Sequence, residues 1–214
     1  MSEPARFVAA NTALLSPPLV PEIRLLLATA VVPLWRKTEE ELEAEGVPPP
    51  YWAFAWAGGQ ALARYVLDHP AEAAGKRVLD FGSGSGLVAI AAAKAGAADI
   101  LAADIDAFAC AAIALNAIAN GVVLRVTHND VIGMPCTWDT ILVGDMCYER
   151  PLAERLLAWL GDCARNGATV LLGDPGRSYF PKSGVEKLGT YNVQTTRDLE
   201  DREIRETSVY RFTA

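Results

Sequence analysis

The sequence has few of the residues that hold metal ions or form hydrolase triads. Its 214 residues include only two histidines, His69 and His128, and four cysteines that form no Cys-x-x-Cys pair. Structural zinc sites and redox dithiols usually show such a pair or a set of histidines. We therefore expect no metal site, and we expect the cysteines to be reduced and packed as small apolar side chains.

Long basic runs and long apolar runs are also missing. The net charge is −7, whereas nucleic-acid affinity comes mostly from Lys and Arg side chains that neutralise phosphates. The apolar segment from Leu25 to Leu34 is too short to span a membrane, and Pro33 interrupts it. No basic start followed by an apolar run marks a secretion signal. These absences predict an intracellular protein with no nucleic-acid partner and no membrane span.

Residues 1–50 are rich in proline and are expected to form a helical extension that caps the main domain, residues 51–214. One helix is predicted to begin at Pro21, since proline is well tolerated in the first turn of a helix. A second is predicted over Thr38–Glu45, which begins with the pattern of a capping box. This stretch is too small to be a separate domain.

From Tyr51 onward, short apolar strands alternate with helical segments, which predicts a mostly parallel sheet with helices on both faces. The expected helices are Gly59–His69, Leu87–Lys94, Ala107–Asn120 and Pro151–Cys163. The expected strands are Arg77–Phe81, Asp99–Ala103, Leu124–Thr127, Thr140–Gly144 and Thr169–Gly173. Two final β-rich runs, Tyr191–Thr196 and Ser208–Thr213, have no long helix between them and predict an antiparallel hairpin. The fold class is therefore α/β and Rossmann-like.

A glycine-rich loop follows the first strand of this pattern. Residues 80–86 read DFGSGSG and lead directly into a helix. In open α/β sheets the ligand binds beyond the carboxyl ends of the strands, where glycine lets the backbone approach it closely. We assign to a cofactor site the residues Asp80, Gly82, Ser83, Gly84 and Gly86. The alternative is an ordinary turn between a strand and a helix.

Further aspartates follow the next two strands. Asp104 comes after the second strand, where a carboxylate can accept hydrogen bonds from both ribose hydroxyls. Asp106 could share that role, but it is better placed as the N-cap of the next helix. Asp130 follows the third strand and is assigned to an adenine amino group, with an ordinary loop aspartate as an equal alternative.

The spacing of the loop separates two nucleotide cofactors that use similar elements. A dinucleotide loop has Gly-x-Gly-x-x-Gly/Ala, whereas this loop is Gly-x-Gly-x-Gly and has Leu87 at the next position. Asp80 would repel a pyrophosphate, but it suits the ammonium and sulfonium groups of S-adenosylmethionine. The loop and the closing hairpin therefore favour S-adenosylmethionine over NAD.

A second short motif, Asp145-Met146-Cys147-Tyr148, follows the fourth strand. Methyl transfer to an amine needs a neutral lone pair, and a lysine with a pKa of about 10.4 is mostly charged at neutral pH. A nearby sulfonium lowers that pKa. Asp145 can align the amine and offset the arriving charge, while Tyr148 can line the lysine channel with its ring. The alternative is a turn that caps the helix at Pro151.

Together these elements resemble the class I, seven-β-strand methyltransferases. Asp145-x-x-Tyr148 is similar to the motif of methyltransferase family 16, whose members modify protein lysines. Residues 49–65, PPYWAFAWAGGQALARY, resemble more specifically the methyltransferases of the β subunit of electron transfer flavoprotein, although Ala57 stands where that family usually has proline. The likeness covers essentially the whole chain and implies that Trp56 lines the cofactor, with packing in the core as an equal alternative.

The resemblance implies a protein-lysine N-methyltransferase that uses S-adenosylmethionine, acts on the β subunit of electron transfer flavoprotein and works in a bacterial cytoplasm. Two alternatives remain. One is methylation of ribosomal protein L11 or another protein, which Asp145-x-x-Tyr148 disfavours. The other is a non-catalytic cofactor-binding module, which the intact aspartates and glycines disfavour. The oligomeric state, the modified lysines and the number of methyl groups are left open.

Overall fold

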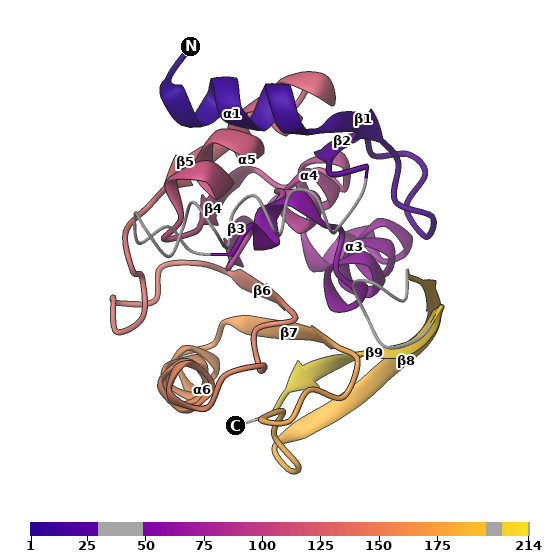
Figure 1. Cartoon of the computed structure of the whole chain (residues 1–214). Helices are drawn as coiled ribbons and strands as arrows, with labels where there is room; N and C mark the ends of the chain where they lie inside the picture. The colour runs from indigo at the N-terminus through magenta and orange to yellow at the C-terminus, as the bar shows by residue number, and fades with distance from the viewer. Residues whose placement is uncertain (30–48, 196–202, 214) are drawn as a thin grey trace.

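The structure, a computed structural model, describes residues 1–29, 49–195 and 203–213. The expected helix over Thr38–Glu45 lies outside these residues. The helices and helical turns in the described part are α1 (Glu3–Asn11), η1 (Tyr51–Ala53), α3 (Ala57–Asp68), η2 (Pro70–Glu72), α4 (Leu87–Lys94), α5 (Ala107–Ala119) and α6 (Arg150–Arg165). The strands are β1 (Ala13–Leu15), β2 (Leu25–Leu27), β3 (Arg77–Phe81), β4 (Asp99–Ala103), β5 (Arg125–Thr127), β6 (Thr140–Gly144), β7 (Thr169–Asp174), β8 (Val185–Gln194) and β9 (Ile204–Phe212) (Figure 1).

Seven strands form one sheet in the order β5-β4-β3-β6-β7-β9-β8. Strands β3 to β7 pair in parallel, and β9 pairs antiparallel with both β7 and β8. This confirms the predicted parallel sheet with an antiparallel C-terminal hairpin. The hairpin strands are longer than predicted. Strand β8 lies at the edge of the sheet and has one buried residue, Val193. Its alternation of apolar and polar residues is therefore weak, and the sequence pattern does not mark its full length.

Side chains of the parallel strands alternate between two hydrophobic cores. Val78 and Leu142 are buried on the face that α3 and α4 cover. Their chain neighbours Leu79 and Ile141 are buried on the opposite face, against α6. Figure 1 shows α6 on the other side of the sheet from α3 and α4. Burial on both faces explains why these strands read as continuous apolar runs in the sequence.

The direction of the strand order reverses between β3 and β6. The chain proceeds from β3 outward through β4 and β5, then returns to place β6 on the other side of β3. Phe81 pairs with Val143, so β3 and β6 end side by side. Such a switch point is where open α/β sheets bind their ligands. It brings the glycine loop and the Asp145–Tyr148 turn to the same edge.

The N-terminal extension differs from the prediction. The expected helix from Pro21 is wrong, because Leu25–Leu27 forms strand β2, which pairs antiparallel with β1. Ile23, Leu25 and Leu27 are all buried, and a spacing of two residues is typical of a strand. Helix α1 was not predicted, although Ser2 caps it.

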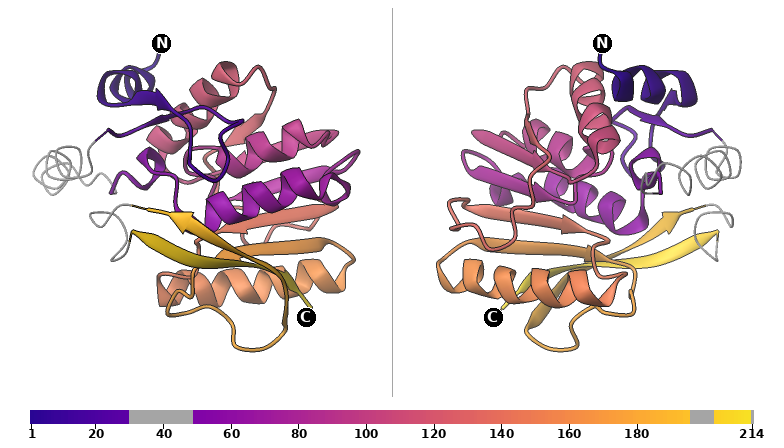
Figure 2. Two further views of the ribbon diagram at one scale, coloured as in Figure 1. Left: turned by 90° about the vertical axis from the view of Figure 1, so that its right-hand side faces the viewer. Right: turned by 60° about the vertical axis from the view of Figure 1, so that its left-hand side comes forward.

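The extension packs against α5 at the ligand edge of the sheet. Val8 of α1 is fully buried in a cluster with Trp52 and residues of α5, and Figure 2 shows α1 alongside α5. Asn116 of α5 donates its side-chain amide to the Ser85 carbonyl at 2.8 Å and accepts the Leu26 amide at 2.7 Å. These buried hydrogen bonds connect the extension to the glycine loop.

None of the helices in the described part of the chain has the length and apolarity that a membrane crossing requires.

Candidate active site

The glycine loop turns sharply after β3 and starts α4. Gly82, Gly84 and Gly86 have φ values of 62°, 54° and 82°, which other residues rarely adopt. A Cβ atom at Gly82 would lie 2.3 Å from Sδ of Met146. The loop therefore lies directly against the Asp145–Tyr148 turn, and a larger residue at position 82 would displace the flexible Met146 side chain and strain the backbone.

Asp80 is buried beneath this loop. Its Oδ2 atom accepts hydrogen bonds from the Ser83 hydroxyl at 2.6 Å and from the Ala89 amide at 2.9 Å. Burial raises the pKa of Asp80 to about 7, and the two hydrogen bonds oppose that shift. A cationic group beside Asp80 would favour its ionised form, and the ammonium of S-adenosylmethionine is such a group.

Asp104 and Asp106 follow β4 and differ in their contacts. Asp104 accepts the Gly84 amide on Oδ2 at 2.8 Å and the Asp106 amide on Oδ1 at 3.0 Å. Each of these oxygens has a second lone pair, so the carboxylate can still accept ribose hydroxyls. Asp106 is the N-cap of α5 and accepts the Phe108 amide at 2.8 Å. Burial raises the pKa of Asp104, and that of Asp106 to about 6.

Asp130 lies at the surface, where it has partners of its own. Its Oδ2 atom accepts a hydrogen bond from Arg155 at 2.8 Å, and its Oδ1 atom accepts the Ile132 amide at 3.0 Å. The bond from Arg155 holds the pKa of Asp130 below its usual value. The adenine role stays a prediction, and it requires this carboxylate to bind an amino group in addition to Arg155.

Asp145 follows β6 directly and has a strained backbone conformation. Its φ of 60° is the only positive value at a non-glycine residue among those that the structure describes. Its Oδ2 atom accepts the amides of Gly58 and Gly59, the second at 3.2 Å, at the N-terminus of α3. The partial positive charge of a helix N-terminus favours the ionised carboxylate. A left-handed non-glycine residue costs about 1–3 kcal/mol and is typical of functional sites.

Glycines allow the N-terminus of α3 to reach the sheet. A Cβ atom at Gly58 would lie 2.3 Å from the carbonyl oxygen of Gly173 and 2.5 Å from Oδ2 of Asp145. A Cβ atom at Gly144 would lie 3.0 Å from Cα of Gly59. The contact between α3 and Asp145 therefore depends on residues without side chains, a role that the sequence pattern does not indicate.

Arg177, in the loop after β7, was not predicted but binds Asp145. Its Nε and Nη2 atoms donate to Oδ1 of Asp145 at 2.9 and 2.7 Å. The two side chains are only 18% and 9% exposed. The guanidinium also lies 5.8 Å from the ring centroid of Trp56. The sequence feature that could have indicated Arg177 is the turn Asp174-Pro175-Gly176-Arg177, because this turn comes at the end of β7, the strand next to β6.

Asp174 anchors the start of that turn. Its Oδ1 atom accepts the amides of Gly176 and Arg177, each at 2.7 Å. Burial raises the pKa of Asp174 to about 6, and the negative charge of Asp145 adds to the shift. The Asp145 amide in turn donates to the carbonyl of Gly173 at 2.9 Å. Two acidic side chains thus stand at the ends of neighbouring strands.

Aromatic side chains flank the Asp145 turn. The ring centroids of Tyr148 and Tyr51 lie 5.6 Å apart, and these residues are 42% and 40% exposed. Trp56 donates its ring N–H to the carbonyl of Tyr51 at 2.8 Å. Burial raises the pKa of Tyr148 to about 12, so its phenol is neutral at physiological pH. These exposed faces can contact a cation.

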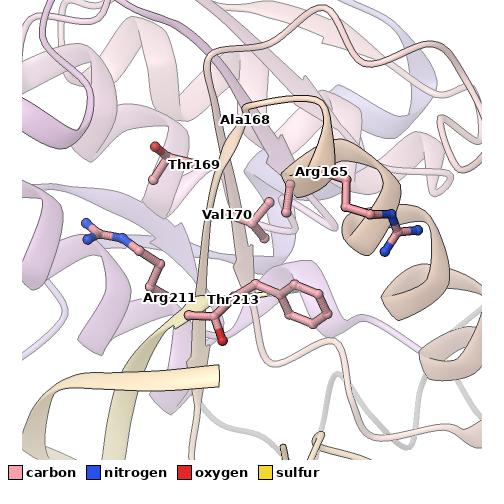
Figure 3. Close-up of a pocket in the computed structure, with 8 residues that line it drawn as sticks. Arg165, Ala168, Thr169, Val170, Arg211 and Thr213 are labelled. Atoms are coloured by element: carbon pink, nitrogen blue, oxygen red, sulfur yellow. The ribbon is translucent and has the colours of Figure 1, made fainter. Parts of the chain in front are cut away.

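A separate cavity of about 360 Å³ lies at the opposite edge of the sheet (Figure 3). Thr169 and Val170 line it where β7 begins, whereas the glycine loop follows the end of β3. The guanidinium groups of Arg165 and Arg211 point away from each other in Figure 3. They do not converge on a ligand, so we assign no site to this cavity.

The fold and the site define a class I, S-adenosylmethionine-dependent methyltransferase. Among solved structures, magnesium protoporphyrin IX methyltransferase from Synechocystis PCC 6803, with S-adenosylmethionine bound, has a similar fold. The identity is 14%, the TM-score is 0.55 and the match covers 86% of each chain. A family profile described as ribosomal protein L11 methyltransferase (PrmA) matches residues 60–142.

Curated relatives identify the family. The chain is 40% identical to the electron transfer flavoprotein beta subunit lysine methyltransferase of Xenopus laevis, over 98% of this chain and 87% of that one. It is 38% identical to the Homo sapiens protein of the same name, over 91% of this chain and 76% of that one. The chain therefore belongs to the electron transfer flavoprotein beta subunit lysine methyltransferase family. This confirms the predicted family, fold class, enzyme class and cofactor, while the roles of individual residues stay predictions.

Proposed function

We propose that this enzyme transfers methyl groups from S-adenosylmethionine to lysine side chains of the electron transfer flavoprotein β subunit. The observation that carries the substrate is the identity of 38–40% to relatives named for that reaction, over more than nine-tenths of this chain. The geometry supports the chemistry, because a buried carboxylate stands directly beside the glycine loop.

The residues at the edge of β3 and β4 fit the cofactor, which supplies a methyl group on a cationic sulfur. The loop from Gly82 to Gly86 exposes backbone to a ligand. In this proposal the ionised carboxylate of Asp80 binds the ammonium of the cofactor, and Asp104 accepts hydrogen bonds from the ribose hydroxyls. Trp56 forms one wall of the site.

In this proposal Asp145 acts on the substrate. It accepts a hydrogen bond from the lysine amine, aligns the lone pair with the methyl group and offsets the charge that arrives with it. The N-terminus of α3 stabilises negative charge on the Asp145 carboxylate. Tyr148 and Tyr51 line the path of the lysine, and the amine proton passes to water.

A second candidate substrate is ribosomal protein L11. The profile match to residues 60–142 favours it, and so does a relative from Aliivibrio salmonicida that is 38% identical over 59% of this chain. That match covers 42% of the relative, whereas the matches to the first family cover 87% of the Xenopus laevis protein and 76% of the Homo sapiens protein. We therefore rank L11 second.

The test uses S-adenosylmethionine with an isotopically labelled methyl group. Purified enzyme is incubated in parallel with intact electron transfer flavoprotein, its isolated folded β subunit and ribosomal protein L11, and labelled lysines are mapped by mass spectrometry. We expect label on β-subunit lysines, with the Asp145→Asn variant as the background. Label on L11 and none on the β subunit would replace the proposed substrate.

A further inference from the structure

Asp145 already binds as many donors as a carboxylate ordinarily accepts. The amides of Gly58 and Gly59 bond to Oδ2, and two N–H groups of Arg177 bond to Oδ1. A carboxylate offers about four lone-pair sites. A substrate amine that binds Asp145 must therefore displace one of these donors.

The two sides of Asp145 differ in their freedom to move. Gly58 and Gly59 belong to the backbone of α3, and Gly58 is pressed against the carbonyl of Gly173. Arg177 binds through a long side chain, while its backbone amide is held separately by Asp174 at 2.7 Å. The side chain can therefore leave Oδ1 without moving the turn that carries it.

Arg177 also resembles the substrate in chemistry and position. Its guanidinium is a cation on Asp145, as the lysine ammonium would be, and it also lies 5.8 Å from the ring centroid of Trp56. We infer that Arg177 occupies on Asp145 the place of the substrate lysine, and that the lysine enters by exchanging with the guanidinium. This inference rests on the proposed function, because it takes Asp145 as the group that receives the amine.

The exchange gives Arg177 a part in specificity. A charge-assisted hydrogen bond is stronger than a neutral one, so a loose lysine side chain competes poorly with a buried two-point contact. A substrate that docks through a wider surface can use that binding free energy to drive the exchange. The displaced guanidinium has an acceptor in its own turn, since Oδ2 of Asp174 is buried and has no hydrogen-bond partner among the described residues.

The decisive experiment replaces Arg177 with a lysine, which can accept a methyl group. In Arg177→Lys the side chain is one atom shorter, and its Nζ falls near the Cζ position of arginine. The neutral amine can then attack the methyl carbon: the N–C bond forms, the C–S bond breaks with its electrons on sulfur, S-adenosylhomocysteine leaves, and one proton passes to water. The variant is incubated with labelled S-adenosylmethionine and no protein substrate.

We expect labelled methyl groups at position 177. The methyl transfer occurs within one molecule, so its first-order rate constant should not depend on enzyme concentration. Arg125→Lys is the matched control, because Arg125 is also paired with an aspartate, Asp99, but at the surface and away from the residues assigned to the site. It should remain unlabelled, as should the double variant Arg177→Lys with Asp145→Asn. A folded Arg177→Lys protein that binds S-adenosylhomocysteine and stays unlabelled at position 177 overturns the inference.

A second variant decides the matter if Arg177→Lys does not fold. Arg177→Gln removes the competing charge, so the KM for the folded β subunit should fall by about tenfold, the scale of one charge-assisted hydrogen bond. A fall in kcat without a fall in KM would mean that Arg177 only positions Asp145, which overturns the inference.

The outcomes also separate this inference from the proposed function. Label at position 177 together with an unlabelled β subunit supports the exchange and removes the proposed partner. If the wild-type enzyme methylates the β subunit and position 177 stays unlabelled in the folded variant, the proposed partner is supported and the exchange is overturned.

Discussion

At the scale of single residues, Asp145 shows how partners compensate the burial of a carboxylate. Burial of an ion is costly unless partners compensate it. The N-terminus of α3 binds one oxygen of Asp145 and Arg177 binds the other. These same contacts hold the residue in a left-handed backbone conformation. We therefore expect the Asp145 charge to matter for the reaction and its shape to matter for the fold.

Asp145→Asn should separate these two effects, because asparagine keeps the shape and tolerates a positive φ. We expect the turnover rate to fall about 100- to 1000-fold, as for other preorganised electrostatic groups, with affinity for S-adenosylhomocysteine nearly unchanged. Asp139→Asn, which breaks a surface ion pair with Arg77, is the control and should keep its turnover. Steady-state kinetics and calorimetry measure both quantities, and near wild-type turnover by Asp145→Asn would refute its role.

Asp104 and Asp106 form a second matched pair. Asp104→Ala should weaken binding of S-adenosylhomocysteine at least about tenfold, because hydrogen bonds from the ribose are lost. Asp106→Ala should instead lower the free energy of unfolding by about 1 kcal/mol, because α5 loses its N-cap. Calorimetry and thermal unfolding of both variants test this. The assignment fails if Asp106→Ala weakens binding more than Asp104→Ala.

Asp80 predicts a pH dependence of stability. Its pKa is raised to about 7 in the folded chain, whereas an unfolded aspartate titrates near pH 4. The stabilisation from Asp80 is therefore fully present below about pH 4 and is lost as the pH rises to about 7. The asparagine in Asp80→Asn cannot ionise, so this variant does not lose stability in that way as the pH rises. Without cofactor, its free energy of unfolding should improve relative to wild type between pH 4 and 7 in denaturant titrations, and a constant difference would contradict this.

At the scale of elements, the contact between α3 and the ends of β6 and β7 positions Asp145. Two adjacent glycines at the start of α3 differ sharply in surroundings. A Cβ atom at Gly58 would meet Gly173 and Asp145, whereas a Cβ atom at Gly59 has no neighbour within 4 Å. The packing of the helix therefore depends on one of the two glycines and not on the other.

Gly58→Ala should push α3 away from the sheet. We expect the free energy of unfolding to fall by about 1–3 kcal/mol, as in other overpacked sites, and turnover to fall as Asp145 loses its amide donors. Gly59→Ala should be neutral or stabilise the protein by up to about 1 kcal/mol, since alanine favours the helix. Denaturant unfolding and initial rates compare the two variants, and equal effects would contradict this account.

At the scale of the whole molecule, the N-terminal extension and the net charge bear on substrate choice. The extension packs beside the glycine loop through α5, and the chain carries a net charge of −7. We therefore expect a lysine-bearing surface of a folded partner to dock beside the site, with part of the attraction electrostatic.

Short peptides that span the modified lysines should accordingly be poor substrates beside the folded β subunit. The value of kcat/KM for the folded subunit should also fall as salt is raised, because salt screens exposed charges. Mass spectrometry after equal incubation compares the two substrates. Equal methylation of the peptide would rule out docking through a surface.

The residues alone predict the parallel sheet and the glycine loop. Strands β3, β4 and β6 and helix α4 begin and end at the predicted residues, because apolar runs buried on both faces and glycine turns are local signals. Leu25–Leu27 misled the prediction, since a short apolar run after a proline suits a helix or a strand. Its pairing with β1 decided in favour of the strand.

The acceptor side of the site depends on packing between elements that lie far apart in the chain. Asp80 and Asp145 were predicted together, because both follow strands that end at one edge of a parallel sheet. Arg177 and Gly58 were not, because each meets Asp145 through contacts between elements far apart in the chain. Such contacts follow from the strand order and from the close approach of α3, and the residues near Asp145 in the sequence predict neither of these features.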